Sequence, residues 1–259
     1  MPHFREHAPG TFCWVELETT DLDAAKSFYQ TLFGWNVVDQ PMGPAGVYTI
    51  FQLNLEDAAA AYQQPEQERE RGVRSHWNLY ISVKDVGAAA ARSVELGAKL
   101  LAGPLEAGQN GRLAILLDPT GATFYLWQGL KTAGLGVMNE NNSFWWADLH
   151  TADRAGGKRF YEALLGWSVA PGAGKDESTY LHIQAGGKFM GGILPDSHRV
   201  AKAPPHWMPY FKVADLDATL KQAEALGAQV FMPPMNVGGA LRIAMLRDPQ
   251  LAAFALFEG

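Results

Sequence analysis

Hydrophobic and polar residues follow two different periods near the start of the chain. The stretch FCWVEL (12–17) alternates as a strand does, and DLDAAKSFYQTLFG (21–34) places its apolar residues at helical spacing. Asp21 is a residue type that caps the first turn of a helix, and Gly34 is a type that ends the last turn. Three further short stretches predict strands: 35–39, 47–54 and 57–63. The predicted order is one strand, one helix and three strands.

The same order follows once more within the first half of the chain. A strand is predicted over 77–83, and a helix runs from Asp85 to Leu96 before Gly97 stops it. Three more strands are expected at 99–102, 112–117 and 123–127. The charged stretch EQERER (66–71) between the two units reads as a solvated loop. The first half is therefore predicted to hold two βαβββ modules.

The second half of the chain repeats the first. FCWVELETTDLDAAKSFYQTLFGWNV from Phe12 and FWWADLHTADRAGGKRFYEALLGWSV from Phe144 agree at twelve of 26 positions, at an offset of 132 residues. Later stretches also match, namely 75–86 with 205–216, 95–104 with 225–234 and 111–127 with 241–257. A repeat this long decides the architecture. It predicts one domain over 1–128, a linker rich in Gly and Asn over 129–142, and a second domain over 143–259.

Composition narrows the class of protein. The chain has 259 residues and a formal net charge of −6, which argues against nucleic acid or an anionic membrane as a partner. A single cysteine excludes an intrachain disulfide and a cysteine metal cluster. The sequence has neither an apolar export signal nor an apolar run long enough to span a membrane, so we expect a cytoplasmic protein.

Several short motifs recur in a fixed order in both halves. They are the helix motif D-x-x-x-x-K-x-F-Y that ends in L-G-W or F-G-W, then V-x-D, then L-G-A, then D-P. This order resembles the vicinal oxygen chelate superfamily, which includes glyoxalase I, bleomycin-resistance proteins and extradiol dioxygenases. The resemblance implies an α+β fold with tandem glyoxalase-like domains. Each domain would consist of two βαβββ modules whose curled mixed sheets surround a cup.

The metal enzymes of this superfamily hold a divalent ion with His and Glu side chains that project into the cup. The resemblance places three of those ligand positions at Trp14, Asn78 and Tyr125 in the first half, and at Trp146, Met208 and Ala255 in the second. Indole, thioether and methyl groups are not ligands for zinc, nickel, manganese or iron. We therefore expect no metal and no cofactor. A large aromatic side chain at the head of each domain suits the stacking of an organic ligand, and its alternative role is to fill the cup.

Alternation along the first strand of each half places Glu16 and Asp148 on the same face as the two tryptophans. A carboxyl group in a cup has a raised pKa and suits a general base or an amine-binding group. The alternative is an ion pair with Arg112 or Arg242, which recur at matching places. His182 has Ile50 as its counterpart, which predicts unequal cups with the His182 side more polar.

The candidate catalytic residues are therefore Glu16, Asp148 and His182, with the catalytic role itself left unknown. The candidate ligand-binding residues are Trp14, Glu16, Asn78, Tyr80, Tyr125, Trp146, Asp148, His182, Met208 and Tyr210. His76 and His206, which recur as His-Trp, are expected at the mouths of the cups.

These residues predict a protein that binds a small, partly aromatic molecule in one or both cups without a metal. Two alternatives stay open. The first is a metal-dependent lyase or dioxygenase with displaced ligands drawn from His76, His182, His206, Glu16 and Asp148. The second is a non-catalytic interaction protein whose cups are filled. Because four modules in one chain can support one another, a monomer is expected, and a homodimer through the outer helices is the alternative.

Overall fold

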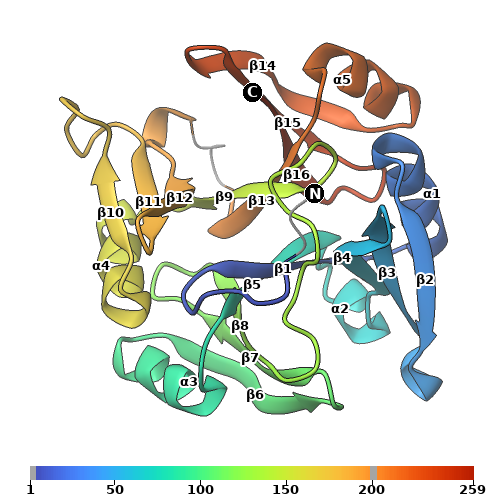
Figure 1. Ribbon diagram of the computed structural model, residues 1–259, viewed down its shortest axis with the longest axis horizontal. Helices are drawn as coiled ribbons and strands as arrows, with labels where there is room; N and C mark the ends of the chain where they lie inside the picture. The colour runs from blue at the N-terminus through green and yellow to red at the C-terminus, as the bar shows by residue number, and fades with distance from the viewer. Residues whose placement is uncertain (1–3, 199–202) are drawn as a thin grey trace.

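The computed structural model describes residues 4–198 and 203–259, and in them the two halves of the chain form two eight-stranded mixed sheets (Figure 1). The first half contains β1 (Phe12–Thr19), α1 (Leu22–Phe33), β2 (Asn36–Pro41), β3 (Val47–Leu53), β4 (Glu56–Gln63), α2 (Glu66–Glu70), β5 (His76–Ser82), α3 (Val86–Glu95), β6 (Lys99–Ala107), β7 (Gly111–Leu117) and β8 (Thr123–Gly129). The second half contains β9 (Phe144–His150), α4 (Arg154–Leu165), β10 (Ser168–Pro171), β11 (Leu181–Ala185), β12 (Lys188–Ile193), β13 (His206–Lys212), α5 (Leu216–Ala225), β14 (Gln229–Gly238), β15 (Leu241–Arg247) and β16 (Ala253–Glu258).

The strand order is β2-β3-β4-β1-β5-β8-β7-β6 in the first sheet and β10-β11-β12-β9-β13-β16-β15-β14 in the second. The two βαβββ modules of each half are joined at the centre of the sheet, where β1 pairs antiparallel with β5 and β9 pairs antiparallel with β13. This confirms the predicted α+β class and the curled sheets of paired modules. Because β1 and β9 are central strands, they carry their inward side chains to the floors of the cups.

The helices begin and end where the sequence indicates. The Asp21 carboxylate accepts a hydrogen bond from the backbone N–H of Ala24 at 3.0 Å, and Asp153 does the same for Gly156 at 2.8 Å. Such caps satisfy backbone donors that lack partners within the first turn. Gly34 ends α1 at φ 69° in the left-handed region, where a glycine avoids the strain that a Cβ would cause.

Two local predictions need correction. The stretch 66–71, expected as a loop, contains the short exposed helix α2, which begins directly after Pro65. Pro65 stands at the N-cap, where its missing backbone N–H removes no hydrogen bond of the helix. Strand β6 is also longer than predicted, because its pairing with β7 continues, through two register shifts, as far as the pair Ala107–Gly111.

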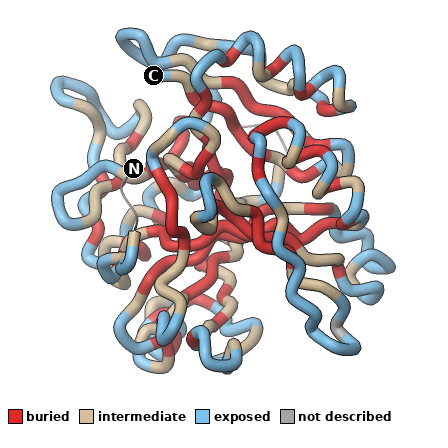
Figure 2. The backbone as a smooth tube through the Cα atoms, turned by 45° about the vertical axis from the view of Figure 1, so that its right-hand side comes forward, coloured by how far each residue is buried: buried red, intermediate tan, exposed pale blue. Residues whose placement is uncertain are grey.

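The two halves share one hydrophobic core. Helix α1 of the first half packs its rings against the second sheet, with Phe28 6.4 Å and Tyr29 5.7 Å from Phe254 between ring centroids. The α4 helix repeats this in the opposite direction, since Phe160 lies 5.7 Å from Phe124. Figure 2 shows the buried segments concentrated in the centre of the molecule, between the helices and hairpins of both halves. Helices α1 and α4 thus join the two halves through this core.

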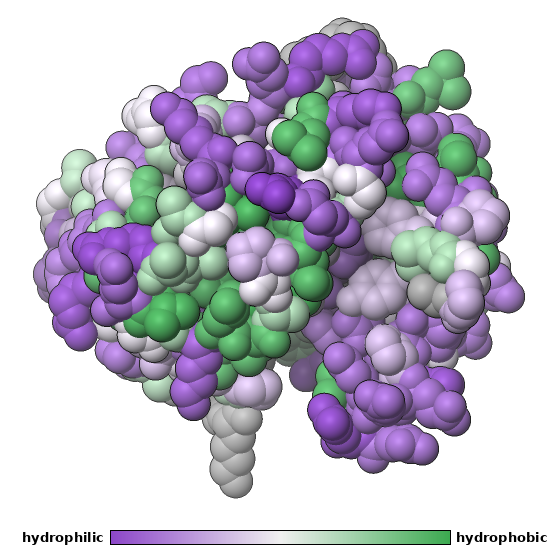
Figure 3. Space-filling model, turned by 90° about the horizontal axis from the view of Figure 1, so that it is seen from below, coloured by the Kyte–Doolittle hydropathy of each residue, from purple (hydrophilic) through white to green (hydrophobic). Residues whose placement is uncertain are grey.

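Polar residues dominate the outside. Figure 3 shows one face largely covered by hydrophilic residues, with hydrophobic ones gathered mainly in one part of it. Most large exposed apolar side chains lie on loops, turns and edge strands, for example Leu55, Leu130 and Leu105. None of the helices in the described residues is both long enough and apolar enough to cross a membrane.

Candidate functional site

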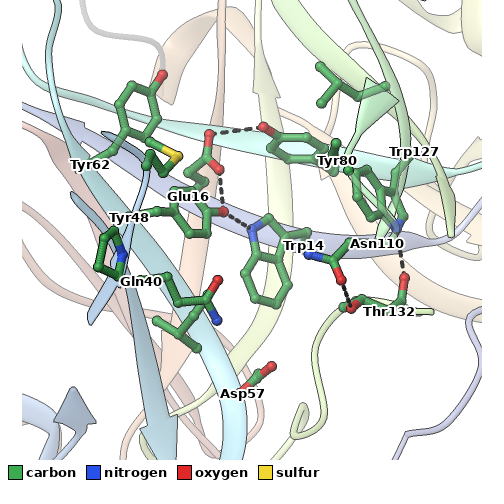
Figure 4. A pocket seen from close by; sticks show the side chains of 17 residues that line it. Trp14, Glu16, Gln40, Tyr48, Asp57, Tyr62, Tyr80, Asn110, Trp127 and Thr132 are labelled. Atoms are coloured by element: carbon green, nitrogen blue, oxygen red, sulfur yellow. Dashed lines mark hydrogen bonds between the residues drawn. The ribbon is translucent and has the colours of Figure 1, made fainter. Parts of the chain in front are cut away.

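The first cup is built around the buried carboxyl group of Glu16 on β1. The Tyr48 hydroxyl, from β3, donates to Glu16 Oε2 at 2.5 Å, and the Tyr80 hydroxyl, from β5, donates to Oε1 at 2.9 Å. The Trp14 indole N–H donates in turn to the Tyr48 hydroxyl oxygen at 3.0 Å. Figure 4 shows these four side chains converging from neighbouring strands. The result is a connected chain of donors that ends on one carboxyl group.

Burial dominates the electrostatics of Glu16. Removal from water raises its pKa to about 7, although hydrogen bonds from Tyr48, Tyr80 and Trp14 act in the opposite direction. Burial disfavours the charged form of a carboxyl group, whereas donors to that form favour it. A carboxyl group with such a pKa exists in both protonation states near neutral pH. It can therefore accept or donate a proton there.

A cavity of about 600 Å³ lies above this carboxyl group. Its lining is Trp14, Glu16, Gln40, Pro41, Met42, Tyr48, Ile50, Asp57, Tyr62, Tyr80, Ala107, Gly108, Asn110, Leu113, Trp127, Thr132 and Gly134. The last two residues belong to the segment between β8 and β9. This segment closes one side of the cup, because the backbone N–H groups of Leu135 and Gly136 donate to the carbonyl oxygens of Cys13 and Asp57, each at 2.8 Å.

The second cup repeats this arrangement around Asp148 on β9. The Tyr180 hydroxyl donates to Asp148 Oδ1 at 2.5 Å, and the Trp146 indole N–H contacts both groups, at 3.0 Å from Oδ1 and 2.7 Å from the hydroxyl oxygen. Burial raises the pKa of Asp148 to about 6, against the hydrogen bond from Tyr180. The hydroxyl of Tyr210 also faces this carboxyl group, in a geometry outside that of a hydrogen bond. It is a buried donor without a hydrogen-bond partner in the described residues.

The second cavity has a volume of about 410 Å³ and a more apolar wall. Its lining is Trp145, Trp146, Asp148, Tyr180, His182, Leu194, His198, Tyr210, Met232, Met235, Asn236, Val237, Leu241, Ile243, Met245 and Phe257. His182 stands on its wall, with its ring 4.9 Å from Tyr180 and 5.4 Å from Phe189 between centroids. Partial burial lowers the pKa of His182. The two cups are thus unequal in size and lining, but the His182 side, which the sequence predicts to be the more polar one, has the more apolar wall because methionine and aliphatic residues line it.

The residues predicted to bind a ligand divide into two groups. Seven of them line a cavity, namely Trp14, Glu16, Tyr80, Trp146, Asp148, His182 and Tyr210. The other three, Asn78, Tyr125 and Met208, are buried and line neither cavity. Asn78 pairs in register with Glu16, and Met208 with Asp148, so the predicted face is right. These side chains lie below the cavity surface, within the packed layer.

Sequence reasoning missed the tyrosines that hold the carboxyl groups. Tyr48 and Tyr180 are separated by 132 residues, the offset of the repeat, and each is two residues before the Ile50–His182 pair. The repeat alignment therefore contained the signal that would have found them.

The indole N–H groups and the two arginines have other partners than predicted. Both indole N–H groups are engaged within the clusters, so only the ring is left to contact a ligand. Arg112 bonds to Glu106 at 2.6 Å instead of Glu16, and Arg242 bonds to Asp217 and Glu258 instead of Asp148. These arginines lie on strand β7 or β15, outside the cups, where their charge stays hydrated. The predicted ion pairs are wrong.

The recurring histidines do not line the cavities either. His76 Nδ1 is 2.9 Å from the carbonyl oxygen of Arg74, and His206 Nδ1 is 2.8 Å from that of Pro204. His206 also stacks on His150 with 4.6 Å between ring centroids. Their expected position at the cup mouths is therefore wrong. They lie at the end of the β1–β5 and β9–β13 pairs, where His76 is opposite Glu18 and His206 is opposite His150.

The donor sets do not fit a divalent metal. In the described residues no group of three or more His, Cys, Asp and Glu side chains is arranged to hold an ion. The one carboxyl group on each floor is already bonded to a phenol, and its other close partners are an indole or a second phenol. Divalent ions of this superfamily require several imidazole or carboxylate ligands at once.

Two repeated halves, each an eight-stranded sheet of paired βαβββ modules around a cup, define a tandem protein of the vicinal oxygen chelate superfamily. Residues 14–127 and 146–257 each match the family described as "Glyoxalase-like domain", and the chain belongs to this family.

Relatives in sequence span the whole chain. "Putative glyoxylase CFP32" of Mycobacterium tuberculosis is 37% identical over 262 residues, which cover 100% of this chain and 98% of that protein. "Anthracycline biosynthesis protein DauV" of a Streptomyces species is 31% identical over 268 residues, which cover 97% of this chain and 94% of that protein.

Solved structures share the fold at low identity. The Mn(II)-bound glyoxalase from Novosphingobium aromaticivorans superposes with a TM-score of 0.67 at 15% identity, over 96% of this chain and 82% of that one. An extradiol ring-cleaving dioxygenase from B. fuscum gives a TM-score of 0.67 at 15% identity, over 98% of this chain and 74% of that one.

Proposed function

We propose that this protein binds a small, planar, partly aromatic molecule in its two cups, with the polar edge of the molecule on the carboxyl group at each floor. The observation that carries the proposal is the cluster that occurs twice, Trp14–Tyr48–Glu16 and Trp146–Tyr180–Asp148. Such a cluster positions a protonatable oxygen beside aromatic ring faces. Apolar walls with a few oriented polar groups are typical of sites for organic molecules.

The sizes of the cavities support this proposal. The volumes of about 600 and 410 Å³ lie within the range of about 300–1,000 Å³ that is usual for small-molecule sites. These cavities also contradict the alternative in which the cups are filled. In the second cup, the unpartnered hydroxyl of Tyr210 is a buried donor that a ligand acceptor would satisfy.

The relatives suggest which compounds to try first. Some of them are named as anthracycline biosynthesis proteins and others as glyoxylase. An anthracycline is thus a reasonable first probe, beside a simple hydroxynaphthoquinone.

Proton transfer is a second candidate function for the same cups. Glu16 and Asp148, with pKa values of about 7 and 6, are suited to act as general bases near neutral pH. His182 on the second wall offers a further proton acceptor close to Asp148, since both line one cavity. The metal-dependent alternative has no support from the donor set.

Calorimetric and fluorescence titration with the two probes tests the proposal. The wild-type protein should bind at least one of them with saturable quenching of tryptophan fluorescence. The variant Y48F with Y180F should bind it more weakly, because the carboxyl groups lose their oriented donors, while Y125F serves as the control. The proposal fails if neither probe, nor a wider panel of planar aromatics, binds at millimolar concentration. Conversion of a probe by the wild-type protein, lost in E16Q or D148N, would establish the proton-transfer function.

A further inference from the structure

The two cups carry different charge. The lining of the first cavity includes two carboxylates, Glu16 and Asp57, and none of the lining residues is a lysine, arginine or histidine. The lining of the second cavity includes one carboxylate, Asp148, together with the imidazoles of His182 and His198. The repeat offset pairs Asp57 of the first half with an apolar residue, Phe189, in the second.

In the described part of the chain, no basic side chain forms an ion pair with Glu16 or Asp57 in the first cup. Glu16 accepts hydrogen bonds from phenol groups, and Asp57 Oδ1 accepts one from the Gln52 side-chain amide at 2.8 Å. Neutral donors of this kind orient a carboxylate but leave its charge in place. Burial and then the carboxylate of Glu16 raise the pKa of the Tyr48 hydroxyl, with Asp57 as a further contributor. Both carboxylates thus act on the same cavity wall.

Aromatic rings surround this charge. Trp14, Tyr48, Tyr62, Tyr80 and Trp127 all line the first cavity, and Figure 4 shows them arranged around Glu16 from several strands. The rings of Tyr48 and Tyr62 are stacked at 6.5 Å between centroids, and those of Tyr80 and Trp127 meet edge to face at 6.3 Å. Aromatic faces attract an ammonium group through their quadrupoles, and several rings together form a cage for it.

The second cup lacks part of this cage. Tyr62 corresponds to Leu194 at the repeat offset, and methionine side chains such as Met232 and Met245 share the wall with five aromatic residues, Trp145, Trp146, Tyr180, Tyr210 and Phe257. Thioether groups adapt to apolar ligands of irregular shape. This wall favours a neutral molecule.

We propose that the first cup selects an organic cation, a protonated amine or quaternary ammonium group attached to a small aromatic body, whereas the second cup takes a neutral aromatic molecule. This inference rests on the proposed binding function and adds the charge class of the ligand. Asp57, together with Glu16 in its ionised form, supplies the opposite charge, and the five rings replace the water that the cation loses.

Two isosteric probes test the inference on the intact protein. (4-Hydroxyphenyl)trimethylammonium and 4-tert-butylphenol have the same shape and differ in one positive charge. Calorimetric titration should give at least tenfold tighter binding of the cation at the first cup, since each decade corresponds to about 1.4 kcal/mol. E16Q and D57N should each weaken binding of the cation about tenfold, and D57N should change binding of the neutral probe less than twofold. E95Q, at an exposed carboxylate on α3 that lines neither cavity, is the control and should leave binding of the cation unchanged.

The outcomes separate this inference from the proposed function. If the neutral probe binds as tightly as the cation, or if D57N and E16Q leave the affinity for the cation unchanged, the selection for cations is refuted while ligand binding stands. If neither probe binds at up to about 5 mM, the inference on cations is refuted as well. The proposed function fails only if no compound of the planar aromatic panel binds either. Thermal unfolding of E16Q and D57N checks that these substitutions leave the fold intact.

Discussion

Two buried hydrogen bonds join the halves of the protein and give a quantitative prediction of stability. The Tyr29 hydroxyl, on α1, donates to Asp248 Oδ2 at 2.9 Å in the other half, and it accepts the indole N–H of Trp77 at 3.3 Å. In the repeat-related place the Tyr161 hydroxyl donates to Asp118 Oδ2 at 2.9 Å. The substitution Y29F removes one hydroxyl group and keeps the ring that packs in the core.

The cost of Y29F follows from the groups that lose a partner. A hydrogen bond to a charged group contributes about 1.5–3 kcal/mol, and one between neutral groups about 0.5–1.5 kcal/mol. We expect Y29F to lower the free energy of unfolding by about 2 kcal/mol at pH 8, where Asp248 is ionised. Y161F should have a similar effect, since its hydroxyl also donates to a buried aspartate of the opposite half.

The pH dependence identifies the partner of Tyr29. Burial raises the pKa of Asp248 to about 6, from an ordinary value of 3.8, although the hydroxyl of Tyr29 acts to lower it. Between these two values the folded protein binds more protons than the unfolded chain, so the contribution of Asp248 to stability falls as the pH rises from 4 to 6. Below pH 5 the carboxyl group is protonated and needs the donor less. The loss in Y29F should therefore shrink by about 1 kcal/mol between pH 8 and pH 5.

Urea unfolding followed by circular dichroism at pH 5 and pH 8 measures these differences. Y125F is the control, because Tyr125 is a buried tyrosine of the same half whose hydroxyl takes part in none of the hydrogen bonds described above. It should change the free energy of unfolding by less than about 0.5 kcal/mol. The reasoning is refuted if Y29F and Y161F match this control at pH 8, or if the loss in Y29F grows as the pH falls.

Three further predictions concern metal, ligand and assembly. Protein purified without added metal should contain no stoichiometric transition metal by elemental analysis, and one tightly held ion per chain would contradict the ligand positions read from the sequence. W14L and W146L should each weaken binding of a planar probe about tenfold or less at the altered cup, with a modest loss of thermal stability. The two variants should differ in how much affinity they lose. If W14L unfolds while its affinity for the probe is unchanged, the indole serves only in packing. The fragments 1–130 and 140–259, expressed separately, should not fold into stable soluble monomers, because each fragment lacks its partners in the shared core. Two stable fragments would show that the halves fold independently.

The sequence predicts the fold because its strongest signals are local and occur twice. The alternation at 12–17, the caps at Asp21 and Asp153 and the glycine ends of the helices agree with one another at every level. A βαβββ unit leaves a sheet face exposed, so its pairing with a second unit follows from the need to bury that face. The short helix α2 cannot be predicted in this way, because its charged residues are exposed and its sequence shows no apolar periodicity.

The site is only partly predictable, because alternation gives the face of a strand and not the depth at which a side chain ends. Asn78 and Met208 point to the predicted side, and yet they are covered by neighbouring residues. Depth depends on contacts between strands that are distant in sequence. Asp57 illustrates the same limit, because it lies where β3 and β4 shift register and where the segment that closes the cup bonds to its backbone carbonyl.

The distribution of differences between the halves has a physical reason. Groups that hold the halves together occur in both copies with the same chemistry. The indole N–H of Trp35 donates to the carbonyl oxygen of Asn142 at 2.8 Å, and the indole N–H of Trp167 donates to the carbonyl oxygen of Gly10 at 2.6 Å. Change at these places costs stability of the whole chain, since a lost partner leaves a buried polar group unpaired. The walls of the cups face a cavity, so a side chain there can change with little effect on the core. Duplication therefore leaves one rigid frame and two separate surfaces on which different ligand specificities can be built.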